Sequence, residues 1–253
     1  MNLSLVLLFL FSVGSLFGWG LEVLFRRFFS KNNPERKWIN PGFLTGPALP
    51  LYGSGLVLLF LIAQLEKHVL PANPVLQKIV LFAMMAEVMT AIEYIAGWGC
   101  LKFAHVRLWD YTGMWGNIQG LICPLFSFFW TVLGAVYYFA IHPYILDALT
   151  WLSQNLAFSF FIGFFYGIFV IDLAHATQIM VTLRRFAAEK QIVIRYEELR
   201  EQIRSYKESR LIRAGFFFSM VSDRPLAAHL AEYHELVKSR ADSFTEKIAR
   251  RKN

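Results

Sequence analysis

Several acids and amides of this sequence lie inside or beside long apolar segments, where a polar side chain is costly. An ionised side chain at the centre of a membrane helix costs at least about 2.5 kcal/mol on insertion scales, so each one needs a partner or a watery cavity. Such a cavity could bind a polar solute, or its carboxylates could do acid/base work near lipid headgroups. The candidate site residues are Glu22, Asn40, Tyr52, Glu93, Trp109, Asp110 and Asn117.

Glu93 stands on a helical face of small residues, with Gly97 one turn later and Ala86 about two turns earlier. Small residues let helices approach closely, so we expect this carboxylate to point into a helix bundle. There it would pair with Arg107 or accept hydrogen bonds from Trp or Tyr side chains.

Asp172 and His175 form a second candidate group. They are three residues apart, so they share a helical face. Because His titrates near neutral pH, the pair could relay protons. The interpretation that we favour is a single satisfied hydrogen bond.

The composition predicts an integral membrane protein. Of the 253 residues, 56% are hydrophobic and 17% are charged, whereas soluble domains have roughly 45–50% apolar and about 25% charged residues. Cys100 and Cys123 form no CxxC motif and no His cluster has ligand spacing, so we expect no disulfide framework, no metal site and no cofactor. The sequence has no Walker loop, nucleophile elbow, HExxH or dinucleotide fingerprint, and we assign no catalytic residue.

Apolar segments of about 20 residues, the length that crosses a bilayer, predict an all-α polytopic membrane fold with five transmembrane helices. The basic cluster between Arg26 and Lys37 is cytoplasmic by the positive-inside rule, whereas the connector His142–Gln154 has no Lys or Arg and falls outside. The predicted topology is therefore N-out and C-in. The helices are expected at about 3–25, 49–65, 78–98, 116–141 and 156–180.

The stretch Asn40–Gly55 is dense in glycine and proline, which do not form an ordinary helix interior. Non-helical backbone at membrane depth is tolerated only where protein or a watery cavity satisfies its polar groups. The stretch is therefore a tight connector or part of a polar site.

On the predicted topology the candidate residues gather on the cytoplasmic half, and Glu87 alone lies nearer the middle. They line a pocket open to the cytoplasm, or their carboxylates simply reach interfacial water and nearby arginines.

The chain divides into a transmembrane helical domain, residues 1–182, and a basic cytoplasmic tail, residues 183–253. The net charge is +7, and the tail carries 16 Lys and Arg against 10 Asp and Glu. Beside five spans, this indicates the side that faces anionic lipid, and no nucleic-acid partner is expected. Helical spacing predicts two amphipathic helices, Arg184–Arg213 and Leu226–Ile248, with a break at Gly215. They form a hairpin that covers its own apolar face, or a surface for a helical partner or self-association.

Four blocks of the sequence carry a resemblance to a known family. They are GWGLEV at Gly18–Val23, INPGFLTGPALPLYGSG at Ile39–Gly55, AIEYIAGW at Ala91–Trp98 and LWDYTGMWGNIQGLIC at Leu108–Cys123. Together they resemble the ABC-transporter type IV family of CmpB-like bacterial membrane proteins, and all seven candidate site residues fall on the family pattern. The resemblance implies a multi-span protein labelled as a permease. The sequence departs from the pattern at Pro41, Cys100 and Leu121.

The embedded polar residues and the resemblance predict a permease component of the bacterial inner membrane, which handles a small solute through the polar site on its cytoplasmic half. Because it lacks an ATPase motif, it would need a separate ATP-binding subunit or an ion gradient. Two alternatives stay open: a membrane scaffold or regulator that acts through its tail, and an enzyme on a lipid-linked substrate. A close pair of carboxylates with a path from the lipid would favour the enzyme.

Overall fold

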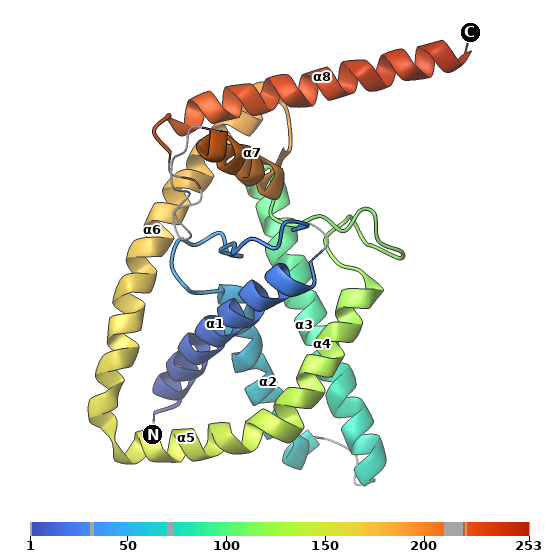
Figure 1. Ribbon diagram of the computed structural model, residues 1–253. Coiled ribbons are helices and arrows are strands. Elements are labelled where there is room, and N and C mark those ends of the chain that lie inside the picture. The colour runs from blue at the N-terminus through green and yellow to red at the C-terminus, as the bar shows by residue number, and fades with distance from the viewer. Residues whose placement is uncertain (1, 31–32, 70–72, 210–219, 221, 253) are drawn as a thin grey trace.

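The computed structural model describes residues 2–30, 33–69, 73–209, 220 and 222–252, and gives no side-chain detail for 67–69 and 245–252. It is built almost entirely of helices, as the all-α prediction requires (Figure 1). The elements in chain order are α1 (Leu3–Phe28), α2 (Pro50–Val69), α3 (Pro74–Ala104), β1 (Val106–Arg107), α4 (Pro124–Val136), the π-helix η1 (Tyr137–Ile141), α5 (His142–Gln154), the 3-10 helix η2 (Leu156–Phe158), α6 (Ser159–Lys190), β2 (Ile194–Arg195), α7 (Tyr196–Ser209) and α8 (Leu226–Lys252).

Caps and prolines determine where α3 begins and ends. The side chain of Asn73 accepts hydrogen bonds from two backbone N–H groups of the first turn, and Pro74 fits the first helical position, where an N–H would have no partner. The helix ends at His105, whose backbone is left-handed, with φ 54°. This turn directs the chain into β1 and into the following loop.

The helices α1 and α2 make the most extensive helix–helix contact in the bundle. Gly14 and Gly18 lie four residues apart on α1 against α2, a spacing of small residues that allows close backbone approach. A Cβ atom on Gly18 would overlap the side chain of Tyr52. The apolar core continues from this contact into α3, α4, η1 and α5, and comprises Leu10, Leu59, Phe60, Ile62, Ala63, Leu81, Met85, Met89, Trp130, Tyr137, Ile145 and Leu149.

The segment Pro124–Gln154 is one bent helix. The bend falls at η1 and at Pro143, and both a π-helical turn and a proline are common causes of a kink. In Figure 1, α4 crosses the molecule diagonally and α5 runs across its lower end. The predicted connector His142–Gln154 is therefore helical, and it packs on the bundle through Ile145 and Leu149.

Four helical segments in the described part of the chain are long and apolar enough to cross a membrane. They are Leu3–Phe28, Pro74–Ala104, Pro124–Gln154 and Leu156–Lys190. The helix α2 is apolar over a shorter stretch, Pro50–Glu66. The polytopic prediction is confirmed, whereas the count of five spans and the N-out, C-in orientation stay predictions.

The predicted start of the fourth membrane helix at Gly116 is wrong. Residues 116–123 are non-helical, and α4 begins at Pro124. The physical reason is that Gly116 and Gly120 have φ of 65° and 68°, a conformation that a right-handed helix does not use.

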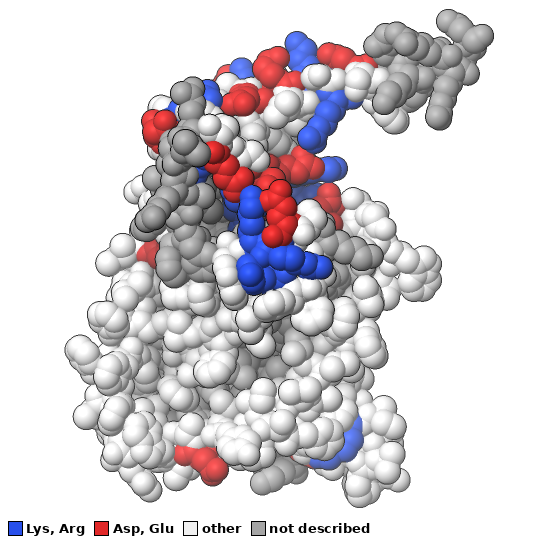
Figure 2. Space-filling model, in the orientation of Figure 1, with Lys and Arg blue, Asp and Glu red and all other residues white. Residues whose placement is uncertain are grey.

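The tail packs at one end of the molecule, which we call the tail side. A second apolar core joins α7 and α8 to the ends of α3 and α6 and to both strands. It comprises Ala104, Val106, Leu183, Ala187, Ile194, Tyr196, Leu199, Ile203, Leu230 and Tyr233. On the face shown in Figure 2, charged side chains gather at the tail side, while the middle is uncharged. Such an uncharged band is what a membrane-embedded surface requires.

The predicted tail helix Arg184–Arg213 is not one continuous helix: it is interrupted at residues 191–195, and its last residues, 210–213, lie outside the described part of the chain. α6 continues to Lys190, and Gln191 then turns left-handed, with φ 54°, and ends it. The chain next forms β2, which pairs in parallel with β1 so that Arg195 is in register with Arg107. Only then does α7 begin, and it packs against α8. The predicted break at Gly215 lies outside the described residues.

Candidate functional site

A chain of hydrogen bonds and one aromatic contact joins α1, α2, α3 and α4. The hydroxyl of Tyr52 donates to Oε2 of Glu22 at 3.0 Å, and the Tyr52 ring lies against the Trp130 ring, with 5.5 Å between centroids. The indole N–H of Trp130 donates to one oxygen of Glu93 at 2.8 Å, and the hydroxyl of Tyr111 donates to the other at 3.0 Å. Glu93 is only 3% exposed, so these two donors satisfy its carboxyl group inside the protein.

Glu22 connects this chain of contacts to the tail. Its Oε1 lies 2.9 Å from Nε of Arg26, and Nη1 of Arg26 lies 2.7 Å from a carboxylate oxygen of Glu197 on α7. A shift of α7 would therefore displace the charge partner of Glu22. Two ion pairs thus connect the tail to the polar groups of the bundle.

Gly97 brings α3 against the polar loop, by which we mean residues 105–123. A Cβ atom at Gly97 would lie 2.9 Å from the ring of Trp109 and 3.1 Å from the side chain of Leu121. The Trp109 indole donates to the backbone oxygen of Leu121 at 2.8 Å, which holds the ring in place. The small face expected around Glu93 is thus the face that meets the loop, and Glu93 takes its partners from Tyr and Trp.

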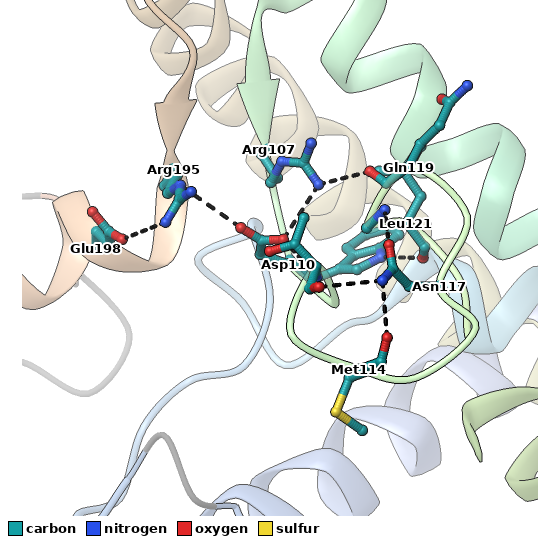
Figure 3. Close-up of polar contacts among 11 residues, drawn as sticks. Arg107, Asp110, Met114, Asn117, Gln119, Leu121, Arg195 and Glu198 are labelled. Atoms are coloured by element: carbon teal, nitrogen blue, oxygen red, sulfur yellow. Dashed lines mark hydrogen bonds and ion pairs between the residues drawn. The ribbon is translucent and has the colours of Figure 1, made fainter. Parts of the chain in front are cut away.

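Asp110 bridges the polar loop to the tail (Figure 3). One carboxylate oxygen lies 3.4 Å from Nη1 of Arg107, and the other lies 3.7 Å from Nε of Arg195. The parallel pairing of β1 with β2 places these two arginines in register. Arg107 also donates to the backbone oxygen of Gln119 at 2.9 Å. Arg107 is therefore engaged here and is not the partner of Glu93.

Asn117 serves the loop itself. Its amide nitrogen donates to the backbone oxygens of Met114 and Thr112, at 2.9 and 3.2 Å, and its oxygen accepts from the N–H of Gly120 at 3.0 Å (Figure 3). These bonds hold the loop in its non-helical conformation. The side-chain amide of Asn117 therefore stabilises the loop, because all of these hydrogen bonds are made within it.

Asn40 holds the glycine- and proline-rich stretch against α1. It is 2% exposed; its oxygen accepts from the indole of Trp19 at 2.9 Å, and its nitrogen donates to the backbone oxygens of Leu44 and Thr45 at 3.2 and 2.9 Å. Protein groups thus satisfy part of this non-helical backbone, as required for irregular structure beside a membrane.

Asp172 and His175 both contact the same stretch. The carboxylate of Asp172 accepts from the backbone N–H groups of Thr45 and Gly46, at 2.9 and 2.7 Å. Nδ1 of His175 lies 3.5 Å from Oγ1 of Thr45. The two side chains share a face of α6, as their spacing indicates, and both contact the stretch Asn40–Gly55. The favoured hydrogen-bonding role and the alternative of a proton relay both stay predictions.

A cavity of about 380 Å³ opens at the tail side between the end of α1, the polar loop and α7. Two predicted site residues, Trp109 and Asp110, line it. Glu22 does not, but it contacts Arg26, which does. Most of its charged lining was not predicted from the sequence; the charged residues are Arg26, Arg107, Arg195, Arg200, Arg204, Asp110, Glu197, Glu198 and Glu201.

A second, more open groove of about 470 Å³ lies between α3 and α4. Glu87 is exposed there, beside Thr90 and Thr131. Among the described contacts, Glu87 takes no part in the network of Glu22 and Glu93. Within the described part of the chain, His, Cys, Asp and Glu side chains do not gather in threes as metal ligands would.

The long apolar helices, the uncharged band and the buried polar network define a polytopic all-helical membrane protein. The family model described as "Putative ABC-transporter type IV" matches residues 9–177. The chain belongs to this family, and the resemblance of the four sequence blocks is confirmed. A search of curated proteins finds no match to the chain, and neither does a search of solved structures.

Proposed function

We propose that this chain is the permease component of an ABC-type transporter and handles a small solute through the polar site at the tail side of the bundle. The observation that carries the proposal is the chain of contacts from the half-buried Glu22 through Tyr52 and Trp130 to the buried Glu93. Ionisable groups inside membrane helices are rare and are typical of substrate and ion pathways. This network also ends at a cavity that opens beyond the membrane helices.

The tail side faces the cytoplasm of a bacterial cell in this proposal, and the chain crosses the inner membrane several times with its N-terminus outside. Basic residues support this orientation, because they gather in the tail and between Arg26 and Lys37. The cavity is then a vestibule that exchanges solute with the cell interior.

A separate ATP-binding subunit would drive transport, since the sequence has no Walker loop. The tail is the part of the chain best placed to receive it. Movement of α7 would reach the bundle through the contact between Glu197 and Arg26, and from there Glu22. This link would connect a partner outside the membrane to Glu22 and, through Tyr52 and Trp130, to the buried Glu93.

Purification of the tagged full chain in mild detergent tests this function. We expect an ATP-binding subunit to co-purify and the complex to move a solute in proteoliposomes with ATP. Glu197→Gln should uncouple ATP hydrolysis from transport, whereas Glu235→Gln should not, because Glu235 is 74% exposed and lies elsewhere on the tail. Absence of any co-purifying ATPase, together with inactive proteoliposomes, would overturn the proposal.

A scaffold that acts through its tail is the second candidate, and the shape of α8 favours it. Figure 1 shows α8 projecting away from the bundle, and Phe244 near its far end is 66% exposed. Truncation after Arg240 removes this end and leaves Leu230 and Tyr233 in the tail core. Loss of a complex with unchanged transport would favour the scaffold.

The enzyme alternative finds little support in the contacts. It called for a close pair of carboxylates with a path from the lipid. Among the described contacts, Glu22, Glu93 and Asp110 each have their own hydrogen-bond or ion-pair partners, and no contact joins two of these carboxylates.

A further inference from the structure

Arg200 places a positive charge in the wall of the tail-side cavity. Its residue is only 7% exposed. Nη1 donates to the backbone oxygen of Asn40 at 2.8 Å, and the guanidinium carbon lies 5.7 Å from the ring centroid of Tyr196. A guanidinium has five N–H donors, and no carboxylate contacts this one among the described residues. Arg200 is therefore a buried cation that lines the cavity, and its guanidinium has further N–H groups that can bind a ligand.

The other charged groups of the cavity are already matched. Among the described residues that line it, five are arginines and four are acids. Each of these acids contacts an arginine other than Arg200, and Arg26 also contacts Glu22, so Arg200 is the one arginine of this described lining without a carboxylate in contact. These pairs are Glu197 with Arg26 at 2.7 Å, Glu198 with Arg195 at 3.1 Å, Asp110 with Arg107 at 3.4 Å, and Glu201 with Arg204.

The surroundings of Arg200 are unfavourable for its charge. Burial, and then the positive charge of Arg26, lower the pKa of Arg200 below its usual value. The guanidinium nevertheless stays protonated, because arginine is not deprotonated in proteins. A buried charge without an ionic partner is strongly destabilising. An anion in the cavity would remove this penalty.

We propose that the cavity binds a phosphate group, with Arg200 as its anchor. Arginine matches the oxygens of phosphate in a bidentate fork, and other arginines converge on the same space. The cavity of about 380 Å³ accommodates a small phosphate-bearing molecule or the headgroup of an anionic lipid that enters from the membrane edge. Both sources present the same chemistry to Arg200. The proposal concerns binding alone and holds whether or not the chain transports the ligand.

Titration of the purified full chain with inorganic phosphate tests the proposal, at constant ionic strength held with chloride. Wild type in phosphatidylcholine nanodiscs should show saturable binding by calorimetry. Arg200→Gln should weaken this binding about tenfold or more, as expected for loss of a charge-assisted bidentate pair. Arg185→Gln is the matched control, because Arg185 is exposed on α6, and it should bind as wild type does.

A second arm replaces phosphatidylcholine by phosphatidylglycerol. Thermal stabilisation by phosphatidylglycerol that Arg200→Gln abolishes, without binding of free phosphate, identifies the headgroup as the source. If Arg200→Gln does not fold, Arg200→Lys decides the question, because it keeps the charge and loses the fork. Weaker binding in Arg200→Lys supports the proposal and unchanged binding overturns it. The proposal is also overturned if wild type binds neither probe, or if Arg200→Gln binds as wild type does.

Discussion

The hydrogen bond from Tyr111 to Glu93 offers the cleanest perturbation of the buried network. Tyr111→Phe removes the donor 3.0 Å from Oε1 of Glu93 and keeps the ring, which stacks on Phe126 with 4.5 Å between centroids and 12° between planes. Burial, and then the charge of Glu93, raise the pKa of Tyr111 above its ordinary value. Its hydroxyl is therefore a proton donor throughout the neutral range.

The expected loss in the free energy of unfolding follows from the Glu93 carboxylate oxygen that the substitution leaves without a donor. Glu93 is 3% exposed, so water cannot readily replace the lost donor. A buried acceptor left without its partner costs about 1–3 kcal/mol. We expect the free energy of unfolding of Tyr111→Phe to fall by this amount, measured by SDS titration of the full chain in mixed micelles with tryptophan fluorescence as the readout.

Tyr144→Phe is the matched control for this measurement. Tyr144 is 74% exposed, so removal of its hydroxyl should change the free energy of unfolding by less than about 0.5 kcal/mol. In a Glu93→Leu background, Tyr111→Phe should also cost little, because the acceptor is gone. Equal stability of Tyr111→Phe and wild type, or an equal loss in both backgrounds, would refute the reasoning.

Three further perturbations address other parts of the structure. Gly18→Ala places a Cβ atom against Tyr52 and should cost about 1–3 kcal/mol by overpacking; unchanged stability in the same SDS titration would contradict the close approach. Asp172→Asn puts an amide NH₂ opposite a backbone N–H of Thr45 or Gly46, so amide exchange at these residues should accelerate; equal exchange rates would contradict the contact. Burial, and then the charge of Arg224, lower the pKa of His229 in the tail core. The unfolded tail then takes up the proton first, so the packing of α7 on α8 should weaken as pH falls below about 6.5. His229→Gln should flatten this dependence in hydrogen exchange, and a pH dependence that the variant retains would contradict it.

The membrane helices and the burial of Glu93 could be predicted from the sequence. Apolar length alone indicates α1 and α3, because few other structures use 20 or more apolar residues in a row. The placement of Gly97 one turn from Glu93 indicated a closely packed face, and this face does meet Trp109. These predictions depend on local spacing, which a sequence displays directly.

The arginines of the cavity could not be predicted in this way. Arg195 contacts Asp110 of the polar loop, and Arg200 lines the same cavity, from positions more than 70 residues further along the chain. The pairing of β1 with β2, which the sequence does not display, places this part of the tail beside the loop. The end of α6 could not be predicted either, because Gln191 adopts the left-handed conformation that glycine usually provides at the end of a helix. The start of α4 was missed because its apolar residues continue those of the loop before Pro124.

Accessibility of the cavity from one side of the membrane tests most directly whether the polar site faces the cytoplasm. Thr112 lines the cavity and is exposed, so Thr112→Cys is a nearly isosteric probe in a chain whose Cys100 and Cys123 are replaced by alanine. A membrane-impermeant maleimide should label this cysteine in inside-out vesicles and leave it unlabelled in right-side-out vesicles. Labelling from the outer face, or from neither face, would contradict the proposed cytoplasmic site.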